Sequence, residues 1–330
     1  MPFALRLERA PPPLSSEDTS AVALSFLRKV GVVSEGYDPL SEAGGGPEGS
    51  APVRVLVDCF LREPDGSWSV AELARATRIP AGQVYRAVWK MQALDWLSDA
   101  GRPAQPALAG RRFQLRFGRL QDAWSFTELA AGHCLARYAA LAKAIEERVK
   151  ARRGAPAGPE PRGKAAESAG RGEFLIALTD APLPRDGAPK DLAVAFLHAT
   201  GLIPERTGGR KPVELPSFRV FFQGFLLQGD RWQDFAALSK VAGSTRPTLQ
   251  KHLRRLEGLD LVERAAFPDE NGFPRRHWRL RQGSLVRAFE FTDARARLSL
   301  ESMGRWAAHL DALAAADRER AKKARPRRRG

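Results

Sequence analysis

The sequence has few of the residues that build redox or metal sites, and it has no long apolar run. Its 330 residues include two cysteines and five histidines. Cys59 and Cys134 each lie in an apolar helical pattern, so we expect two buried thiols rather than a disulfide. No apolar segment approaches the ~20 residues that cross a bilayer, and the N-terminus lacks the apolar core of a secretory signal. These absences predict a cytoplasmic protein.

Motifs for catalysis are missing as well. The histidines are scattered, and none has metal-ligand spacing with a cysteine or a carboxylate. The chain has no phosphate-binding Walker motif, no dinucleotide fingerprint and no Gly-x-Ser-x-Gly. We therefore expect a protein that is not an enzyme and that holds no metal or cofactor.

What the sequence does have is positive charge, with a formal net charge of +15. Residues 1–150 contribute +2, residues 151–171 contribute +3, residues 172–316 contribute +4 and residues 317–330 contribute +6. The total suggests a polyanionic partner, but more than half of the excess lies outside the parts expected to fold. A basic patch on a folded part must therefore be local.

The chain also repeats itself. From Pro52 to Thr127, an offset of 165 residues aligns the first half with the second half without a gap. Under this offset Phe60 aligns with Phe225, and Leu94 aligns with Leu259. One offset holds through apolar and turn positions alike, which indicates a tandem duplication.

The repeat predicts four segments. Residues 1–150 form the first copy and residues 172–316 form the second. The Ala-, Gly- and Pro-rich segment 151–171 between them is typical of a flexible linker. The highly charged segment 317–330 is expected to be a disordered basic tail.

Each copy shows the same order of patterns: an apolar helix, a short helix, a tight turn, a second helix and two extended segments joined by a polar loop. In the second copy, Leu249, Leu253 and Leu256 form an apolar stripe at helical spacing. Ser244 is expected to cap this helix, with Pro247 in its first turn. The corresponding stripe in the first copy is Val84, Val88 and Met91. This order is that of a winged helix containing a helix-turn-helix.

The segment LSKVAGSTRPTLQKHLRRLEGLDLVER (238–264), followed by RRHWRL, resembles the winged helix-turn-helix of ArsR- and MarR-type transcriptional regulators. The resemblance covers residues 218–282 and, more loosely, 53–117. The chain departs from those families in having no cysteine metal box, and in having Asp95 and Asp260 where glycine is common. The resemblance implies a mainly α fold with small β-wings (α+β): two tandem winged helix-turn-helix domains, each followed by a long C-terminal helix. It also implies double-stranded DNA as the partner.

The second copy carries the stronger candidate interface. Five basic residues and no acid lie between Lys240 and Arg255. With the leucine stripe inward, Arg246 and Gln250 suit base edges in the major groove, because both side chains can form bidentate contacts. The other candidates suit phosphates or the wing's backbone contacts. They are Ser244, Thr245, Thr248, Lys251, Arg254, Arg255, Arg275 and Arg276.

The first copy allows two interpretations. Gln83, Arg86 and Lys90, with Arg111 and Arg112 on the wing, are candidate DNA contacts. Tyr85 and Trp89 also point outward, and such side chains suit a protein contact equally well.

Each copy is expected to end in a long helix capped by Thr127 or Thr292. Along helices 128–150 and 293–316, apolar residues recur at spacings of three and four, which suits helix pairing. We expect the seam Leu135–Val149 to face the seam Leu300–Ala314 within one chain, or like seams to pair between two chains. Packing of each helix onto its own domain is the remaining alternative.

These features favour a nucleoid-associated transcriptional regulator. Two other functions remain open: a plasmid- or phage-type replication initiator, since one such family resembles this tandem architecture, and a winged-helix scaffold in chromosome organisation or segregation. The target sequence, an effector ligand and the choice between activation and repression are not encoded in any motif that we recognise.

Overall fold

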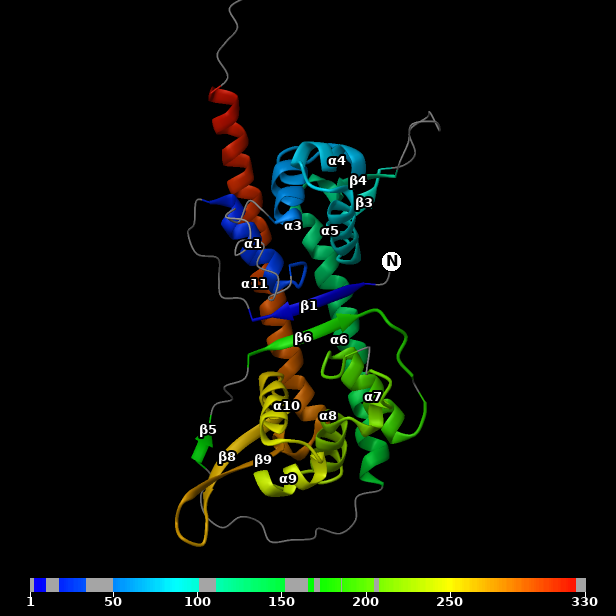
Figure 1. Cartoon of the computed structure of the whole chain (residues 1–330), viewed down its shortest axis with the longest axis vertical. Coiled ribbons are helices and arrows are strands. Elements are labelled where there is room, and N and C mark those ends of the chain that lie inside the picture. Colours follow the sequence, from blue (N-terminus) through cyan, green and yellow to red (C-terminus); the bar gives the residue numbers. More distant parts are fainter. Residues whose placement is uncertain are drawn as a thin grey trace, which may run out of the picture. The chain divides into compact units, whose positions relative to one another are not determined.

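A computed structural model describes residues 3–9, 18–33, 50–100, 111–151, 166–168, 173–184, 186–204 and 208–324 (Figure 1). The chain divides into two compact units. Unit 1 comprises Met1–Ala131 and Leu298–Gly330, and unit 2 comprises Gly132–Arg297. Within the described ranges, no helix combines the length and apolarity needed to span a bilayer.

Unit 1 is a set of helices with a small antiparallel sheet. Its elements are β1 (Ala4–Glu8), α1 (Thr19–Lys29), α3 (Ala51–Arg54), the π-helix η2 (Val55–Leu61), β2 (Ser67–Ser69), α4 (Val70–Thr77), α5 (Ala81–Ala93), β3 (Leu97–Asp99), β4 (Arg112–Leu115), the 3-10 helix η4 (Arg116–Gly118) and the first part of α6 (Leu120–Lys150). The three short strands pair in the order β2-β4-β3, with Trp68 opposite Phe113 and Asp99 opposite the same residue.

Unit 2 repeats the order of elements found in unit 1, with β5 and η5 in addition. Its elements are the rest of α6, β5 (Ala166–Ser168), β6 (Leu175–Thr179), α7 (Pro189–Ala199), η5 (Pro212–Glu214), α8 (Pro216–Arg219), the π-helix η6 (Val220–Leu226), β7 (Gln233–Asp234), α9 (Phe235–Ala242), α10 (Arg246–Gly258), β8 (Val262–Pro268), β9 (Pro274–Leu280), η7 (Arg281–Gly283) and the first part of α11 (Leu285–Ala324). Its strands pair in the order β5-β8-β9-β7.

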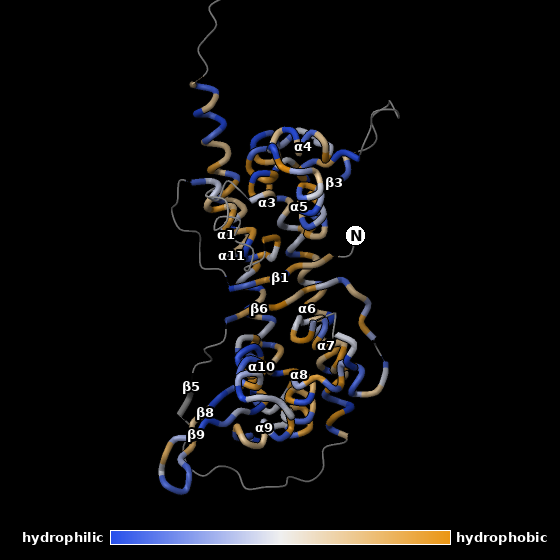
Figure 2. The backbone as a smooth tube through the Cα atoms, in the orientation of Figure 1, coloured by the Kyte–Doolittle hydropathy of each residue, from blue (hydrophilic) through white to orange (hydrophobic). Residues whose placement is uncertain are grey.

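The elements recur at the offset seen in the sequence. The bounds of α4, α5 and η4 reappear 165 residues later as those of α9, α10 and η7. The expected combination of helices with small sheets is therefore confirmed, and the apolar stripes of α5 and α10 are buried as predicted. Figure 2 shows apolar segments alternating with polar ones along these elements, as amphipathic helices around a core require.

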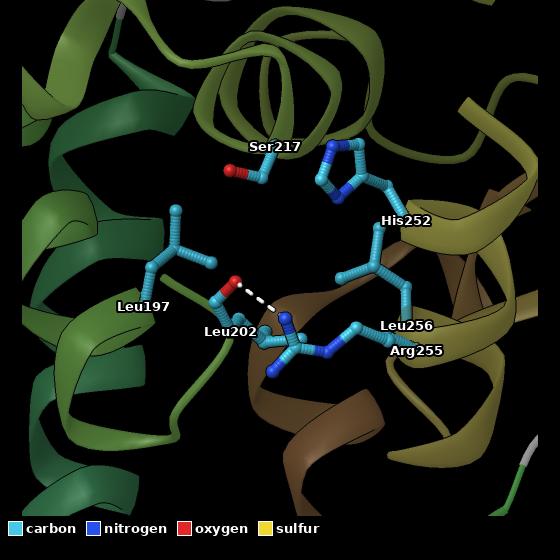
Figure 3. Close-up of a pocket in the computed structure, with 6 residues that line it drawn as sticks. All are labelled: Leu197, Leu202, Ser217, His252, Arg255 and Leu256. Carbon is cyan, nitrogen blue, oxygen red and sulfur yellow. Dashed lines mark hydrogen bonds between the residues drawn. The ribbon is translucent and has the colours of Figure 1, made fainter. Parts of the chain in front are cut away.

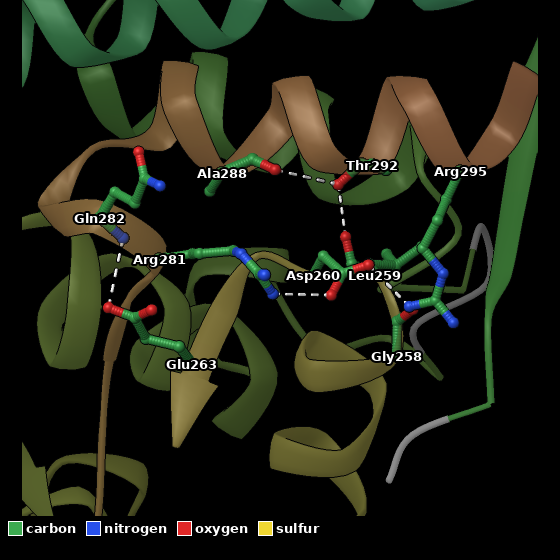
Figure 4. A network of polar contacts seen from close by, with 9 residues as sticks. All are labelled: Gly258, Leu259, Asp260, Glu263, Arg281, Gln282, Ala288, Thr292 and Arg295. Carbon is green, nitrogen blue, oxygen red and sulfur yellow. Dashed lines mark hydrogen bonds and ion pairs between the residues drawn. The ribbon is translucent and has the colours of Figure 1, made fainter. Parts of the chain in front are cut away.

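The left-handed backbone positions recur as well. Asp95 and Asp260 follow α5 and α10 with φ of 63° and 59°. Such a conformation favours glycine, and aspartate is among the residues that tolerate it. Asp260 gains further contacts there, because its carboxylate forms ion pairs with Arg281 at 2.8 Å and Arg295 at 2.6 Å (Figure 4). The departure from glycine noted in the sequence therefore has a structural basis.

The two threonines expected to begin the long helices lie inside them instead. Helices α6 and α11 begin at Leu120 and Leu285. The buried hydroxyl of Thr127 donates a hydrogen bond of 2.6 Å to the carbonyl of Leu94, and that of Thr292 donates to the carbonyl of Leu259 (Figure 4). The expected N-caps are wrong, because each hydroxyl is used to bind the C-terminal end of α5 or α10. The pattern Thr-acid alone could not distinguish these roles.

The N-termini of the long helices are capped by carboxylates from the other long helix. In unit 1, Asp311 accepts hydrogen bonds from the amides of Leu120 at 3.0 Å and Gln121 at 2.9 Å. In unit 2, Glu146 accepts from the Ser284 hydroxyl at 2.7 Å and the Val286 amide at 2.9 Å. Glu146 and Asp311 are 165 residues apart, so the same capping contact occurs twice. A carboxylate of α11 caps α6 in unit 1, and a carboxylate of α6 caps α11 in unit 2.

Both predicted seams are buried, but their register differs from the expectation. The Leu135–Val149 seam lies against the beginning of α11 in unit 2, where the ring of Tyr138 meets that of Phe289 edge-on at 6.5 Å. The Leu300–Ala314 seam lies against the beginning of α6 in unit 1, where the Trp124 indole donates to the carbonyl of Leu300 at 3.2 Å. The two helices thus pair within one chain, but the seams do not face each other.

Two boundaries also need correction. Helix α11 continues to Ala324, and Arg318 donates to the carbonyl of Leu61, so the tail is not disordered from residue 317 as expected. Within the expected linker, Ala166–Ser168 forms β5 and pairs with β8. Residues 152–165, 169–171 and 325–330 lie outside the described part of the chain.

Candidate nucleic-acid interface

The turn between α9 and α10 places the helix that carries the candidate contacts. Gly243 ends α9 with a φ of 57°, and Thr245 precedes α10 as its N-cap residue, with Pro247 in the first turn. The Thr245 hydroxyl lies 3.0 Å from that of Thr248. Ser244 is not the cap, and its hydroxyl oxygen is buried without a partner among the described residues. The predicted N-cap role of Ser244 is therefore wrong.

The outward face of α10 is basic and uncompensated. Arg246, Gln250, Lys251 and Arg254 are all exposed, while the leucine stripe beneath them is buried. In the part of the chain that the structure describes, neither Lys251 nor Arg254 has an ion-pair partner. The Arg246 guanidinium lies over the ring of Phe235 at 5.5 Å. Arg246, Gln250 and Lys251 are thus exposed as predicted, whereas Thr248, which was expected to point outward with them, is half-buried.

Arg255 does not belong to this face. Its guanidinium points into unit 2 and donates hydrogen bonds to the carbonyls of Gly201 and Leu202, just after α7 (Figure 3). In the first copy, Lys90 makes the corresponding contact, donating from Nζ to the carbonyl of Val32 at 2.6 Å. Both residues were expected to bind phosphates. Both instead attach the second helix of their copy to the end of an earlier helix.

A small pocket surrounds Arg255. It is lined by Leu197, Leu202, Ser217, His252, Arg255 and Leu256 and encloses about 220 Å³, open solvent included (Figure 3). The space inside it that water can occupy is only about 10 Å³, roughly one water molecule, so the pocket is too small for a ligand. Burial, together with the charges of Arg255 and Lys251, lowers the pKa of His252. His252 is therefore neutral at pH 7 and adds no charge to the basic face.

The segment expected to form the wing of the second copy is a long hairpin. Strands β8 and β9 pair from Val262↔Leu280 to Pro268↔Pro274, and the hairpin extends away from the helices of unit 2 (Figure 1). Arg275 and Arg276 are exposed near its end. Arg275 forms an ion pair of 2.9 Å with Asp269, whereas Arg276 has no charged partner among the described residues. Arg276 is thus the more available of the two predicted wing contacts.

The equivalent face in the first copy has a different chemistry. Gln83 and Arg86 are exposed on α5, as predicted. Tyr85 and Trp89 are 58% and 49% exposed, and they occupy the positions of Gln250 and Arg254. Aromatic rings thus replace two polar side chains, so α5 cannot make the same contacts as α10.

The basic residues on the first wing are occupied. Arg111 forms an exposed ion pair with Asp99 at 2.8 Å. Arg112 donates to the hydroxyl and carbonyl of Ser67 and forms an ion pair with Glu72 at 3.0 Å. Glu72 and Ser69 in turn form a capping box at the start of α4. Arg112 therefore links β4 to β2 and to the start of α4, and its guanidinium is already engaged in these contacts.

The hairpin end contains a feature that the sequence interpretation missed. Phe273 lies between Gly272 and Pro274 at the turn and is 68% exposed. The dipeptide Asn271-Gly272 is a strong hairpin-turn signal and places Phe273 at the tip. The signal was present, but an apolar residue in a polar loop gives no indication of a role by itself.

The described residues contain no group of three or more His, Cys, Asp or Glu side chains placed to hold a metal ion. Comparison with protein-family models, with curated proteins and with solved structures found no match to this chain. The chemistry of the site therefore rests on the exposed basic face of α10, the adjoining hairpin and the aromatic face of α5.

Proposed function

We propose that this protein binds double-stranded DNA through two tandem winged helix-turn-helix domains, with α10 as the principal recognition helix. The observation that carries the proposal is the exposed face of α10. Three basic side chains and one amide project there from a helix that follows a tight turn, and its opposite face is buried. Uncompensated basic charge on one helical face is the electrostatic footprint of nucleic-acid binding.

Different residues have different roles in this proposal. Arg246 and Gln250, one turn apart near the start of α10, read base edges, since each can form two hydrogen bonds to a guanine or an adenine. Lys251 and Arg254 bind phosphates, as does Arg276 on the wing. Phosphate contacts position the helix and carry no sequence information. Mutations of the base-reading residues should therefore change sequence preference, whereas mutations of the phosphate-binding residues should weaken binding to all sequences alike.

We propose a transcriptional regulator as the role. The first copy supports a second candidate, a scaffold or initiator that also contacts protein. Tyr85 and Trp89 are exposed on α5, and tyrosine and tryptophan are enriched where proteins bind one another. In that candidate the second copy binds DNA and the first copy binds a partner protein.

The primary test is binding of the full chain to duplexes from a randomised pool, measured by fluorescence anisotropy over a range of salt. Lys251→Ala should make the log–log salt dependence shallower by about 0.9, the value for one lost phosphate contact. Lys190→Ala is the matched control, since Lys190 is an exposed lysine of unit 2 on α7. Absence of duplex binding by the wild type would refute the proposal.

Base reading has a separate signature. Arg246→Ala or Gln250→Ala should weaken binding to the enriched sequence by roughly 1–3 kcal/mol, the value of a good bidentate base contact. Binding to random duplex should change little. Equal losses on both duplexes would show that these residues bind the backbone.

Two deletions test whether the basic C-terminal arm, residues 318–330, contributes to DNA binding. Deleting residues 325–330 removes four arginines beyond the end of α11. We expect a shallower salt dependence and unchanged stability. Deleting 318–330 also removes the hydrogen bond from Arg318 to the carbonyl of Leu61, so the protein should in addition become less stable. An unchanged salt dependence in both variants would exclude the arm from DNA binding.

A further inference from the structure

The end of the β8–β9 hairpin combines an exposed aromatic ring with a fixed backbone. Phe273 is 68% exposed, the highest value among the exposed large hydrophobic side chains of the described residues. Its backbone is held on both sides: its amide donates to the Asp269 carboxylate at 2.9 Å, and its carbonyl accepts from the Asp269 amide at 2.8 Å. The ring contributes to neither bond. Its exposure is therefore not needed to form the turn.

Asp269 organises this turn. Its carboxylate also accepts hydrogen bonds from the Asn271 amide and from Arg275 Nε, both at 2.9 Å. The amide of Phe273, the largest influence, holds the pKa of Asp269 below its usual range together with these groups. The carboxylate thus stays ionised and the tip stays ordered at neutral pH.

Aromatic packing supports the strands next to the tip. Phe267 meets the rings of Trp232 and His277 edge-on, each at 5.2 Å, and the Arg279 guanidinium lies over Trp232 at 4.4 Å. These contacts fix the strands that carry the tip. A ring presented on a braced hairpin loses little conformational freedom when it is inserted into a partner.

Charge does not explain the tip. Asp269 and Glu270 balance Arg275 and Arg276 in number, so the hairpin end has no net positive charge, although Arg276 has no charged partner among the described residues. Figure 2 shows that the hairpin end is mostly hydrophilic. What the tip offers a DNA duplex is therefore an apolar wedge, flanked by Arg276 for the adjoining backbone.

We infer that Phe273 inserts between two base pairs in the minor groove and bends the DNA that α10 binds. This inference rests on the proposed DNA binding and adds DNA deformation to it. Apolar side chains that enter the minor groove partly unstack one base step and kink the duplex by about 20–90°. Pyrimidine–purine steps such as TA unstack most easily, so the tip should favour sites with such a step beside the α10 contacts.

The experiment uses the full chain and a duplex of about 30 base pairs enriched from a randomised pool by the wild type. Dyes at the two ends report bending by energy transfer, and 2-aminopurine placed at successive steps reports unstacking. We expect the wild type to shorten the end-to-end distance and to raise 2-aminopurine fluorescence at one step. Phe273→Ala should abolish both signals at saturating protein and weaken binding about tenfold. The free energy gained by burying a phenylalanine side chain corresponds to a change of at least about that size in the dissociation constant.

Two variants make the result specific. Phe273→Leu keeps an apolar wedge and should retain most of the bend. Phe117→Ala removes another exposed phenylalanine, 65% exposed and outside the hairpin, and should behave as wild type. A bend and an affinity unchanged in Phe273→Ala would overturn the wedge while leaving DNA binding by α10 intact. Failure of the wild type to enrich any duplex would overturn the proposed function and this inference together.

Discussion

Two adjacent arginines on α10 provide the sharpest test of the reasoning, because the structure gives them opposite roles. Arg254 is exposed and has no partner among the described residues, whereas Arg255 donates hydrogen bonds to the carbonyls of Gly201 and Leu202. Sequence alone treats them alike. The structure predicts that Arg254→Ala affects DNA binding and that Arg255→Ala affects folding.

The magnitudes follow from these contacts. Hydrogen bonds that involve a charged group contribute about 1.5–3 kcal/mol, so Arg255→Ala should lower the free energy of unfolding by about that amount. Arg254→Ala should stay within about 0.5 kcal/mol of wild type, as expected for a surface substitution. Arg254→Ala should, however, lose one phosphate contact. The slope of the logarithm of the binding constant against the logarithm of the salt concentration should become shallower by about 0.9, and binding should be about eightfold weaker at 0.1 M salt.

Urea denaturation and fluorescence anisotropy on the same protein samples measure both quantities. Arg255→Lys is a useful companion, since Lys90 makes the equivalent contact in the first copy and a lysine should recover part of the stability. Equal losses of stability in the two alanine variants, or a fully stable Arg255→Ala in which only DNA binding declines, would contradict the opposite roles of Arg254 and Arg255.

Three further predictions concern the fold. Thr127→Val should destabilise the protein more than Thr292→Val, because Thr127 both donates to the Leu94 carbonyl and accepts from the Trp96 indole at 3.0 Å; urea denaturation would contradict this if the order were reversed. The pKa of Glu72 is lowered, chiefly by the Ser69 amide, so the contribution of Glu72 to stability is present above its unfolded pKa and is lost as the pH falls through its folded pKa. Glu72→Gln should therefore make the free energy of unfolding less dependent on pH on the acid side. An unchanged pH dependence in this variant would exclude the role. Burial raises the pKa of Cys59 to about 12 and that of Cys134 to about 11, so neither thiol should react with a thiol reagent at pH 8 until the chain is unfolded, and rapid labelling of the native protein would show that they are accessible.

The repeated pattern determined much of the local structure. The stripe Leu249, Leu253 and Leu256 is buried, and the first copy's Val84, Val88 and Met91 are buried likewise. Helical spacing of apolar residues fixes which face of a helix lies inward, whatever the helix packs against. For this reason the outward positions Arg246, Gln250, Lys251 and Arg254 were predictable from the sequence.

The partner of each polar side chain was not predictable. Ser244 and Thr245 are adjacent and equally suited to capping, and only the chain path through the α9–α10 turn puts Thr245 at the N-cap position, where its side chain makes no capping hydrogen bond. Arg112 resembles a wing contact in sequence, yet it reaches Ser67 and Glu72 because β2 pairs with β4. Hydrogen bonds form between groups that the fold brings together, and sequence spacing does not report those distances.

The long helices show the same division most clearly. The sequence by itself determined that α6 and α11 carry apolar seams, since the spacing of three and four residues is a property of each helix alone. Only the tertiary structure decided their register, in which Glu146 caps the start of α11 and Asp311 caps the start of α6. The physical reason is that an apolar seam is nearly uniform along its length and tolerates several alignments. The alignment is selected by the polar groups at the helix ends, whose amides must find an acceptor.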